Sequence, residues 1–276
     1  MPETSTIPTT SQREQPTEKA DDALTVCAIS VVAAIMTNVV HEGAGHGLTA
    51  LATGANSGVL TTVAWSSAFD SRLVEAGGTL ANLIAAIVFW VFLRAAGRAS
   101  MSVRYFLVLA CAFNLFAGTG YFLFSGVTDF GDWAIVISGL HPHWVWRMAL
   151  VVVGAASYYA AVRAVGVWLV RFGGVPRQQW RRLRRLTIAP YVSAIVLMSV
   201  GALLNPLGIQ LLWQSALPAT AGGQSGMLWL PYAIPRKAAP QANQALVRRD
   251  WPWVVAAAIL ALLFLLLLGR GITVHR

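Results

Sequence analysis

Charged side chains are scarce in this sequence. Asp, Glu, Lys and Arg make up 11% of its 276 residues, whereas an ordinary globular domain carries about 25%. Hydrophobic residues make up 57%, which is more than one soluble core can shelter from water. The imbalance excludes a soluble domain and predicts an integral membrane protein.

Cysteine and histidine are also rare. The two cysteines, Cys27 and Cys111, lie in separate apolar runs, which excludes a disulfide framework and a zinc knuckle. Five histidines are too few for the histidine-rich di-iron membrane oxidases. Many transporters contain internal repeats, and this sequence has none, which mildly favours an enzyme over a transporter.

Long apolar runs account for most of the chain. A spanning helix needs about 20 predominantly apolar residues. Six segments qualify, namely 24–52, 76–95, 105–124, 145–171, 188–214 and 251–269. The sequence therefore predicts an all-α, multi-pass transmembrane helical bundle of about six spans, surrounded by membrane lipid.

The chain divides into four parts. Residues 1–22 are polar and predict a disordered cytoplasmic tail; they lack the features of a cleaved signal peptide, so we expect the first span to be retained. Residues 23–214 form the membrane bundle with the candidate metal site. Residues 215–250 contain glycines and prolines that predict an irregular loop, and residues 251–276 form the final transmembrane helix and a short tail.

Arginines lie at the ends of the apolar runs. Although the formal charge is +9, this placement is typical of membrane orientation and not of a nucleic-acid-binding face. With six spans, the basic clusters at 94–104, 171–185 and 270–276 fall on the side of the N-terminus. The opposing loops carry Arg72 and a late basic group at 236–249. We therefore expect cytoplasmic N- and C-termini in a bacterial-type plasma membrane.

His41, Glu42 and His46 interrupt the first span. Ionisable groups inside a membrane are costly and mark function, and two imidazoles beside a carboxylate favour a Zn²⁺ site with Glu42 as the base. The histidines are five residues apart, which separates them by about 140° on a regular helix. Glycines at 43, 45 and 47 would allow the π-bulge that a shared metal requires.

Two alternatives remain for this segment. Glu42 and His46 are four residues apart and would share a helix face as a ligand pair. The histidines would otherwise line a polar cleft that holds no metal.

Two aspartates, Asp129 and Asp132, follow the third span on the expected face of the histidines. Either one completes a His/His/Asp zinc site with a free position for water. Asp132, between Gly131 and Trp133, is the better candidate because it fits an interfacial turn. Otherwise both aspartates are loop acids that cap the next helix.

Two asparagines lie within predicted spans. Asn82 ends a segment of small residues, 76–82, that opens the second span, and Asn114 lies in the third. Small residues let helices approach closely, so these positions either serve packing alone or hydrogen-bond within the bundle.

Together these motifs resemble the site-2 protease family of intramembrane zinc metalloproteases, over about residues 30–135. The resemblance implies a transmembrane protein as substrate. It implies that His41, His46 and either Asp132 or Asp129 are zinc ligands. It also implies that Glu42 is the catalytic base and that Asn82 and Asn114 bind the substrate backbone.

This chain departs from the family pattern at three points. The histidine spacing is five residues instead of four, and is similar to the longer motif of dipeptidyl-peptidase III. Gly131-Asp132-Trp133 stands where the family has Leu-Asp-Gly. The arginine pattern points the site outward, whereas the family's site opens toward the cytoplasm.

The sequence thus predicts a zinc-dependent intramembrane metallopeptidase that hydrolyses a peptide bond of a membrane substrate. The rival hypothesis is a noncatalytic metal-binding protein or small cation or proton transporter, in which Glu42, Asp129 and Asp132 line a path. A third hypothesis is a degenerate relative of these proteases that serves as a membrane scaffold.

Overall fold

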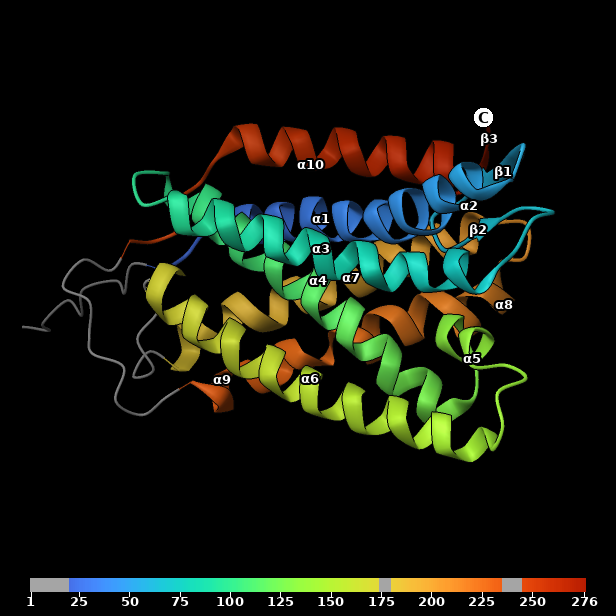
Figure 1. Ribbon diagram of the computed structural model, residues 1–276. Helices are drawn as coiled ribbons and strands as arrows, with labels where there is room; N and C mark the ends of the chain where they lie inside the picture. Colours follow the sequence, from blue (N-terminus) through green and yellow to red (C-terminus); the bar gives the residue numbers. More distant parts are fainter. Residues whose placement is uncertain (1–19, 174–179, 235–244) are drawn as a thin grey trace, which may run out of the picture.

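The computed structural model describes residues 20–173, 180–234 and 245–276, so most of the expected tail, 1–19, lies outside it. Within these residues six helices are long and apolar enough to cross a membrane, which confirms the predicted multi-pass helical bundle (Figure 1). They are Ala23–Thr53, Arg72–Ala95, Met101–Thr128, His143–Arg171, Trp180–Leu204 and Trp251–Leu268.

The first spanning helix changes its winding along its length. It consists of α1 (Ala23–Asn38), the π-helix η1 (Val39–Gly47) and α2 (Leu48–Thr53). The chain then forms the short strands β1 (Ser57–Leu60) and β2 (Trp65–Ser66), which pair antiparallel. This hairpin packs against η1.

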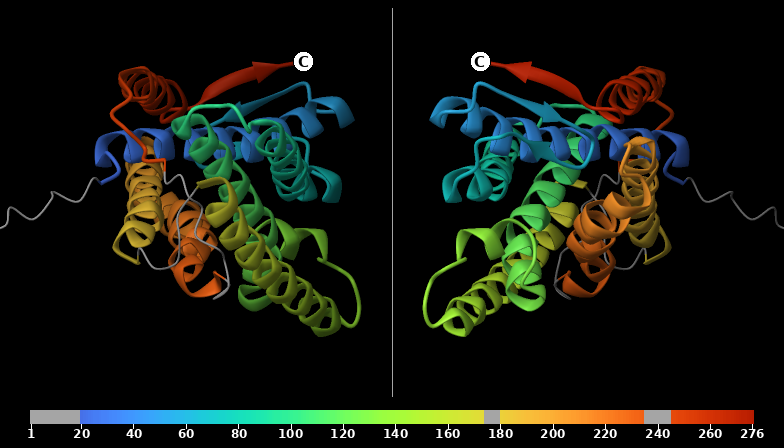
Figure 2. Two further views of the ribbon diagram at one scale, coloured as in Figure 1. Left: turned by 90° about the vertical axis from the view of Figure 1, so that its left-hand side faces the viewer. Right: turned by 90° about the vertical axis from the view of Figure 1, so that its right-hand side faces the viewer.

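The next four spanning helices and one short linker helix build the centre of the bundle. These are α3 (Arg72–Ala95), α4 (Met101–Thr128), the short α5 (Asp132–Val136), α6 (His143–Gly173) and α7 (Trp180–Leu204). Viewed along the bundle, α4 lies between α3 and α6, and α10 (Trp251–Leu263) lies outside α1 (Figure 2). Buried aromatic side chains on α4, including Tyr105, Phe113 and Phe116, fill the core.

The outer helices carry apolar side chains on their exposed faces. The last span consists of α10 and the π-helix η5 (Phe264–Leu268). Only 11% of its 18-residue apolar stretch is buried, against 61% of the corresponding stretch in α4. Ile84, Ile87 and Val91 are likewise exposed on α3. In water such surfaces would be an aggregation hazard; here they provide the lipid-facing exterior of an integral membrane protein.

A helical segment returns through the bundle between α7 and α10. It comprises α8 (Ile209–Leu211), the π-helices η2 (Leu212–Ala216) and η3 (Pro218–Gly222), the 3-10 turn η4 (Gly223–Ser225) and α9 (Gly226–Ala233). At one end the Ser215 hydroxyl donates to the Val63 carbonyl, and at the other Arg163 of α6 donates to Ala233.

This segment differs from the sequence expectation. The span expected over 188–214 ends at Leu204, and residues 215–233 of the expected loop are helical. Residues 235–244 lie outside the described residues, and residues 245–250 form no helix or strand. The apolar side chains of the helical segment, such as Met227 and Leu230, are buried in the core. The glycines at 222, 223 and 226 accompany changes of helical winding and do not form an open loop.

The return segment places the two ends of the described chain at opposite ends of the bundle (Figure 1). Before α10, the Val247 carbonyl accepts from the Asp22 backbone at the start of α1. After α10, strand β3 (Ile272–His275) pairs antiparallel with β1, beyond the far end of α1. Ile209–Ala233 thus runs back along the bundle between α7 and α10, a seventh passage along it that hydropathy alone does not reveal. The side of the membrane on which each terminus lies stays a prediction.

Candidate metal centre

The π-helix η1 brings His41 and His46 together. Their Nε2 atoms lie 3.2 Å apart and both side chains are buried. A π-helix closes i→i+5 hydrogen bonds, so residues five apart lie over one another instead of on different faces. The widened turn that the spacing predicted is confirmed.

Glycines allow α3 to approach this turn closely. A Cβ on Gly45 would collide with the Gly78 backbone, and a Cβ on Gly78 would lie 2.7 Å from His41 Nε2 and collide with His46. None of the η1 glycines has a positive φ. Gly45 therefore serves the close packing of two helices and not the backbone freedom that the sequence suggested.

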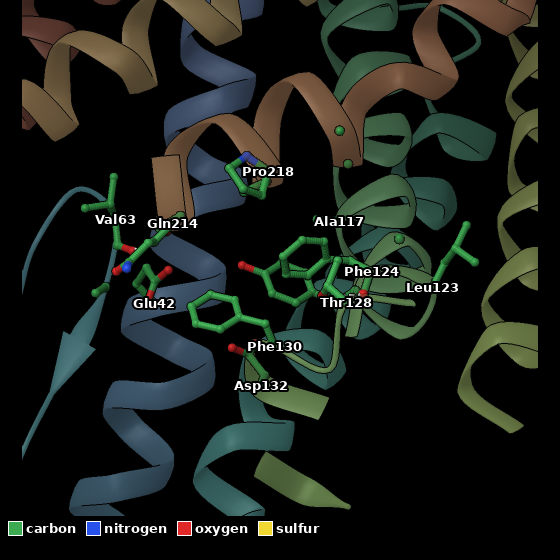
Figure 3. A pocket seen from close by; sticks show the side chains of 18 of the residues that line it. Glu42, Val63, Ala117, Leu123, Phe124, Thr128, Phe130, Asp132, Gln214 and Pro218 are labelled. Carbon is green, nitrogen blue, oxygen red and sulfur yellow. Dashed lines mark hydrogen bonds between the residues drawn. The ribbon is translucent and has the colours of Figure 1, made fainter. Parts of the chain in front are cut away.

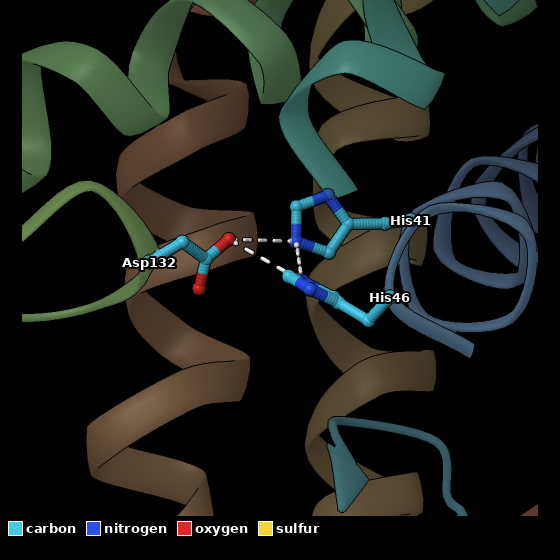
Figure 4. A group of neighbouring side chains, drawn as sticks. All are labelled: His41, His46 and Asp132. Carbon is cyan, nitrogen blue, oxygen red and sulfur yellow. Dashed lines mark hydrogen bonds and ion pairs between the residues drawn. The ribbon is translucent and has the colours of Figure 1, made fainter. Parts of the chain in front are cut away.

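Asp132 is the carboxylate that joins the histidines (Figure 4). Its Oδ2 lies 3.2 Å from His41 Nε2 and 3.4 Å from His46 Nε2. Asp132 begins α5 directly after Gly131, whose φ of +82° turns the chain toward η1. One ligand atom from each of the three residues lies within 4.8 Å of the others, an arrangement that could hold a metal ion.

The hydrogen bonds of the histidine Nδ1 atoms determine which ring nitrogen carries the proton. His46 Nδ1 lies 2.8 Å from the Val74 carbonyl, which only accepts, so the proton is on Nδ1. His41 Nδ1 lies 2.6 Å from Asn82 Oδ1, so it also carries the proton. In the neutral imidazoles both Nε2 atoms then present bare lone pairs to each other.

Asn82 is oriented by its own contacts. Its amide nitrogen donates to the Thr37 carbonyl and to Asn114 Oδ1, so its oxygen must face His41. Asn114 in turn donates to the Thr37 hydroxyl. Both asparagines are fully buried. Their role as substrate clamps stays a prediction; in the structure they form the network that fixes the His41 ring.

Three lone-pair donors without a proton between them are the pattern of a cation site. The buried Asp132 Oδ2 has no hydrogen-bond partner among the described residues. Two His nitrogens with one carboxylate oxygen match the ligands of open zinc sites.

Glu42 lies beside the three ligands and not among them. Its Oε2 accepts a hydrogen bond of 2.9 Å from the backbone N–H of Trp65 in β2. The Trp65 ring packs over Gly47 and Gly58, which anchors the hairpin to η1. The geometry groups His41 and His46 with Asp132, instead of pairing Glu42 with His46.

A cavity of about 640 Å³ opens beside this cluster (Figure 3). Glu42, His46 and Asp132 line its polar side, and Phe124 and Phe130 belong to its apolar walls. The return segment contributes further lining through Leu211, Gln214, Pro218 and Ala219. A second cavity of about 50 Å³ shares Glu42 and Tyr121 with the first.

Asp129 belongs to a different cluster. It ends α4 with a φ of +56° and contacts His143 Nε2 at 2.9 Å and Arg147 at 3.5 Å. These groups are partly exposed, and Arg147 also donates to the Gly126 and Val127 carbonyls. Asp129 therefore stabilises the α4–α6 connection and is not the third member of the metal-donor group.

Comparison with protein-family models, with curated proteins and with solved structures finds no match to this chain. The resemblance to site-2 proteases therefore depends on the motif residues alone. The sequence analysis included Gly78 in the small-residue segment 76–82, which was expected to let helices approach closely, and the contact between Gly78 and the histidines agrees with this. It gave no role at the site to Trp65 or Tyr121.

Proposed function

We propose that this protein is a zinc-dependent metallopeptidase that cleaves membrane-embedded substrates. The observation that carries the proposal is the convergence of two imidazole nitrogens and a carboxylate oxygen, with Glu42 adjacent, inside a membrane bundle. Bound zinc would supply a Lewis acid that makes water acidic enough to lose a proton near neutral pH. His41, His46 and Asp132 are the residues that would hold it.

Glu42 is suited to accept that proton. Its Oε2 is fixed by Trp65, and no described residue donates to its Oε1. It faces the same cavity as His46 and Asp132. After water attacks the scissile carbonyl, Glu42 would return the proton to the departing amine, so that one carboxylate serves both steps.

The cavity supports a peptide segment as the substrate. Its walls combine aromatic and aliphatic side chains with a few polar groups at one end, the usual composition of an organic-ligand site. The return segment and α4 form opposite parts of its lining. An apolar stretch of a membrane protein would bind these walls and present its backbone to Glu42.

The arrangement of acids disfavours the transporter hypothesis. Among the described residues, Asp21, Asp22 and Asp250 lie at the start of α1 and α10. The other acids, Glu42, Asp70, Glu75, Asp129 and Asp132, gather at the opposite end. An acid-lined path through the membrane would require carboxylates between these groups, and the described chain has none there.

The basic residues favour one orientation. More arginines lie at the N-terminal end of the bundle than at the other end. Those at the N-terminal end are at positions 94, 98, 104, 171, 181, 182, 184, 185, 248 and 249, and those at the other end are at 72, 147, 270 and 276. The seventh passage moves Arg248 and Arg249 to the side of the other clusters. By the positive-inside rule the N-terminal end is cytoplasmic and the candidate metal centre lies toward the external face.

The test compares membranes of cells that produce either the wild-type chain or Glu42→Gln. New protein N-termini are identified by labelling and mass spectrometry, which requires no known substrate. We expect membrane-protein cleavage products with the wild type that disappear with Glu42→Gln, while both chains keep stoichiometric metal. Identical sets of N-termini would contradict the peptidase proposal.

A further inference from the structure

Tyr121 of α4 lies at the boundary of the two cavities. Its ring stacks on that of His41, with centroids 4.7 Å apart and planes inclined by 25°. It lines both the 640 Å³ and the 50 Å³ cavity, together with Glu42. Its side chain therefore lies directly beside the three metal-donor atoms.

The hydroxyl of Tyr121 has no hydrogen-bond partner among the described residues, which is unusual for this chain. The hydroxyls of the other well-packed tyrosines donate to backbone carbonyls: Tyr105 to Leu186, Tyr158 to Gly223 and Tyr191 to Ala221. Tyr159 and Tyr232 are exposed on the bundle surface. Tyr121 is half-buried and lines the cavity. Because a tyrosine hydroxyl in such a position normally finds a partner, the partner of Tyr121 is to be sought in the cavity.

We propose that Tyr121 is a catalytic residue that donates a hydrogen bond to the substrate's carbonyl oxygen. The inference depends on the proposed peptidase function. When water attacks the carbonyl carbon, the C=O π electrons move onto oxygen and the water proton moves to Glu42. The phenol stabilises the resulting negative charge and keeps its own proton, so no further co-reactant is needed. The C–N bond then breaks as Glu42 protonates the amine.

The surroundings suit a donor of this kind. Glu42, Glu75 and Asp132 line the same cavity as Tyr121. Carboxylates cannot stabilise an oxyanion, whereas a phenol O–H can donate a hydrogen bond to it. Removal of one donor from an oxyanion hole typically lowers kcat by about 10²–10³.

The first test uses a ligand instead of turnover. Cobalt-substituted protein is titrated with inorganic phosphate, a tetrahedral anion, and binding is followed by the visible absorption of the metal. For Tyr121→Phe, which keeps the ring that stacks on His41, we expect unchanged metal content and a phosphate Kd raised about 10-fold, as for loss of a hydrogen bond to a charged group. An unchanged Kd, or no phosphate response in the wild type, overturns the assignment.

The matched control is Tyr158→Phe. Tyr158 lines the same large cavity, but its hydroxyl contacts Gly223, Ser225 and the backbone N–H of Gly226. This variant should lose stability and retain the wild-type phosphate Kd. Equal weakening in both variants would mean that Tyr121 acts only through the shape of the cavity.

The second test uses a peptide that spans a cleavage site found by the N-terminus comparison. Tyr121→Phe should lower kcat by about 10²–10³ with KM within about threefold, whereas a purely structural role would alter metal content or KM. Full activity in Tyr121→Phe beside an inactive Glu42→Gln overturns the inference and leaves the peptidase function standing. Absence of cleavage by the wild type contradicts the function itself.

Discussion

The two ends of the bundle each bury an aspartate, and they treat it in opposite ways. Asp21 receives two hydrogen bonds from Arg182, of 2.6 and 3.0 Å, and a third from the Val247 backbone. Asp132 has only the bare nitrogens of His41 and His46 beside its Oδ2. The first carboxylate is compensated within the protein, as a structural clamp requires, whereas the second belongs to a group that could hold a cation.

The end that contains Asp21 therefore contributes to the stability of the fold, and the end that contains Asp132 holds the candidate metal centre. The Asp21–Arg182 pair ties α1, α7 and the chain before α10 together. The Asp132 cluster instead stores unfavourable contacts that a bound metal would relieve. Substitutions at the two ends should therefore affect different measurements.

The largest contrast between the ends is the side of the membrane on which each lies. Alkaline phosphatase fused after Arg185 should be inactive in a bacterial host, since that position is cytoplasmic, whereas fusion after Arg276 should be active. The reason is the seventh passage, Ile209–Ala233. Inactivity of both fusions would restore an even number of crossings and contradict the arrangement.

Gly78→Ala should remove the metal without unfolding the bundle. The new Cβ would collide with His46 and lie 2.7 Å from His41 Nε2, so the imidazoles must separate. Metal content of the purified chain should fall from stoichiometric to background. Gly97→Ala is the control, because its Cβ would meet nothing within 4 Å; loss of metal there too would discredit the steric explanation.

Arg182→Ala should cost about 3–5 kcal/mol of unfolding free energy, because it leaves the Asp21 charge buried and unpaired. Metal content of the folded fraction should not change. In metal-free protein, Asp132→Asn should cost little or stabilise, since it removes a carboxylate that faces two lone pairs. Denaturant titration in detergent measures both, and equal destabilisation would remove the distinction between the ends.

Asn82→Ala should have a smaller effect than Gly78→Ala, lowering metal affinity about 10–100-fold, the usual consequence of losing the partner of a ligating histidine. The His41 Nδ1–H would lose its acceptor. Competition with a chelator measures the change. Asn114→Ala, one hydrogen bond further away, should lose less, and a larger loss than that of Asn82→Ala would place the key contact elsewhere.

Much of the site was predictable because buried polar residues stand out in an apolar chain. His41, Glu42 and His46 were conspicuous in the first span, and their spacing required a π-helix because no regular helix brings positions five apart together. The choice of Asp132 over Asp129 was only a preference. It depends on the turn at Gly131 and on Arg147 and His143, which are contacts between distant segments.

Other features had no signal in the sequence. The seventh passage, Ile209–Ala233, is interrupted by three glutamines and three glycines, so no single apolar run in it reaches spanning length. Strand β3 consists of four residues whose partner, β1, lies about 200 positions earlier. Tyr121 looked like one more aromatic residue in an apolar helix, because its importance comes from the ring of His41 beside it.

X-ray absorption at the zinc edge of the purified full-length chain tests the central claim most directly. We predict one zinc per chain with imidazole scattering from two histidines, oxygen or nitrogen ligands at about 2.0–2.2 Å, and the same spectrum for Glu42→Gln. His46→Ala should lose the metal. Absence of stoichiometric metal after zinc loading, a spectrum without imidazole, or loss of zinc in Glu42→Gln would contradict a His41, His46 and Asp132 centre with Glu42 as its base.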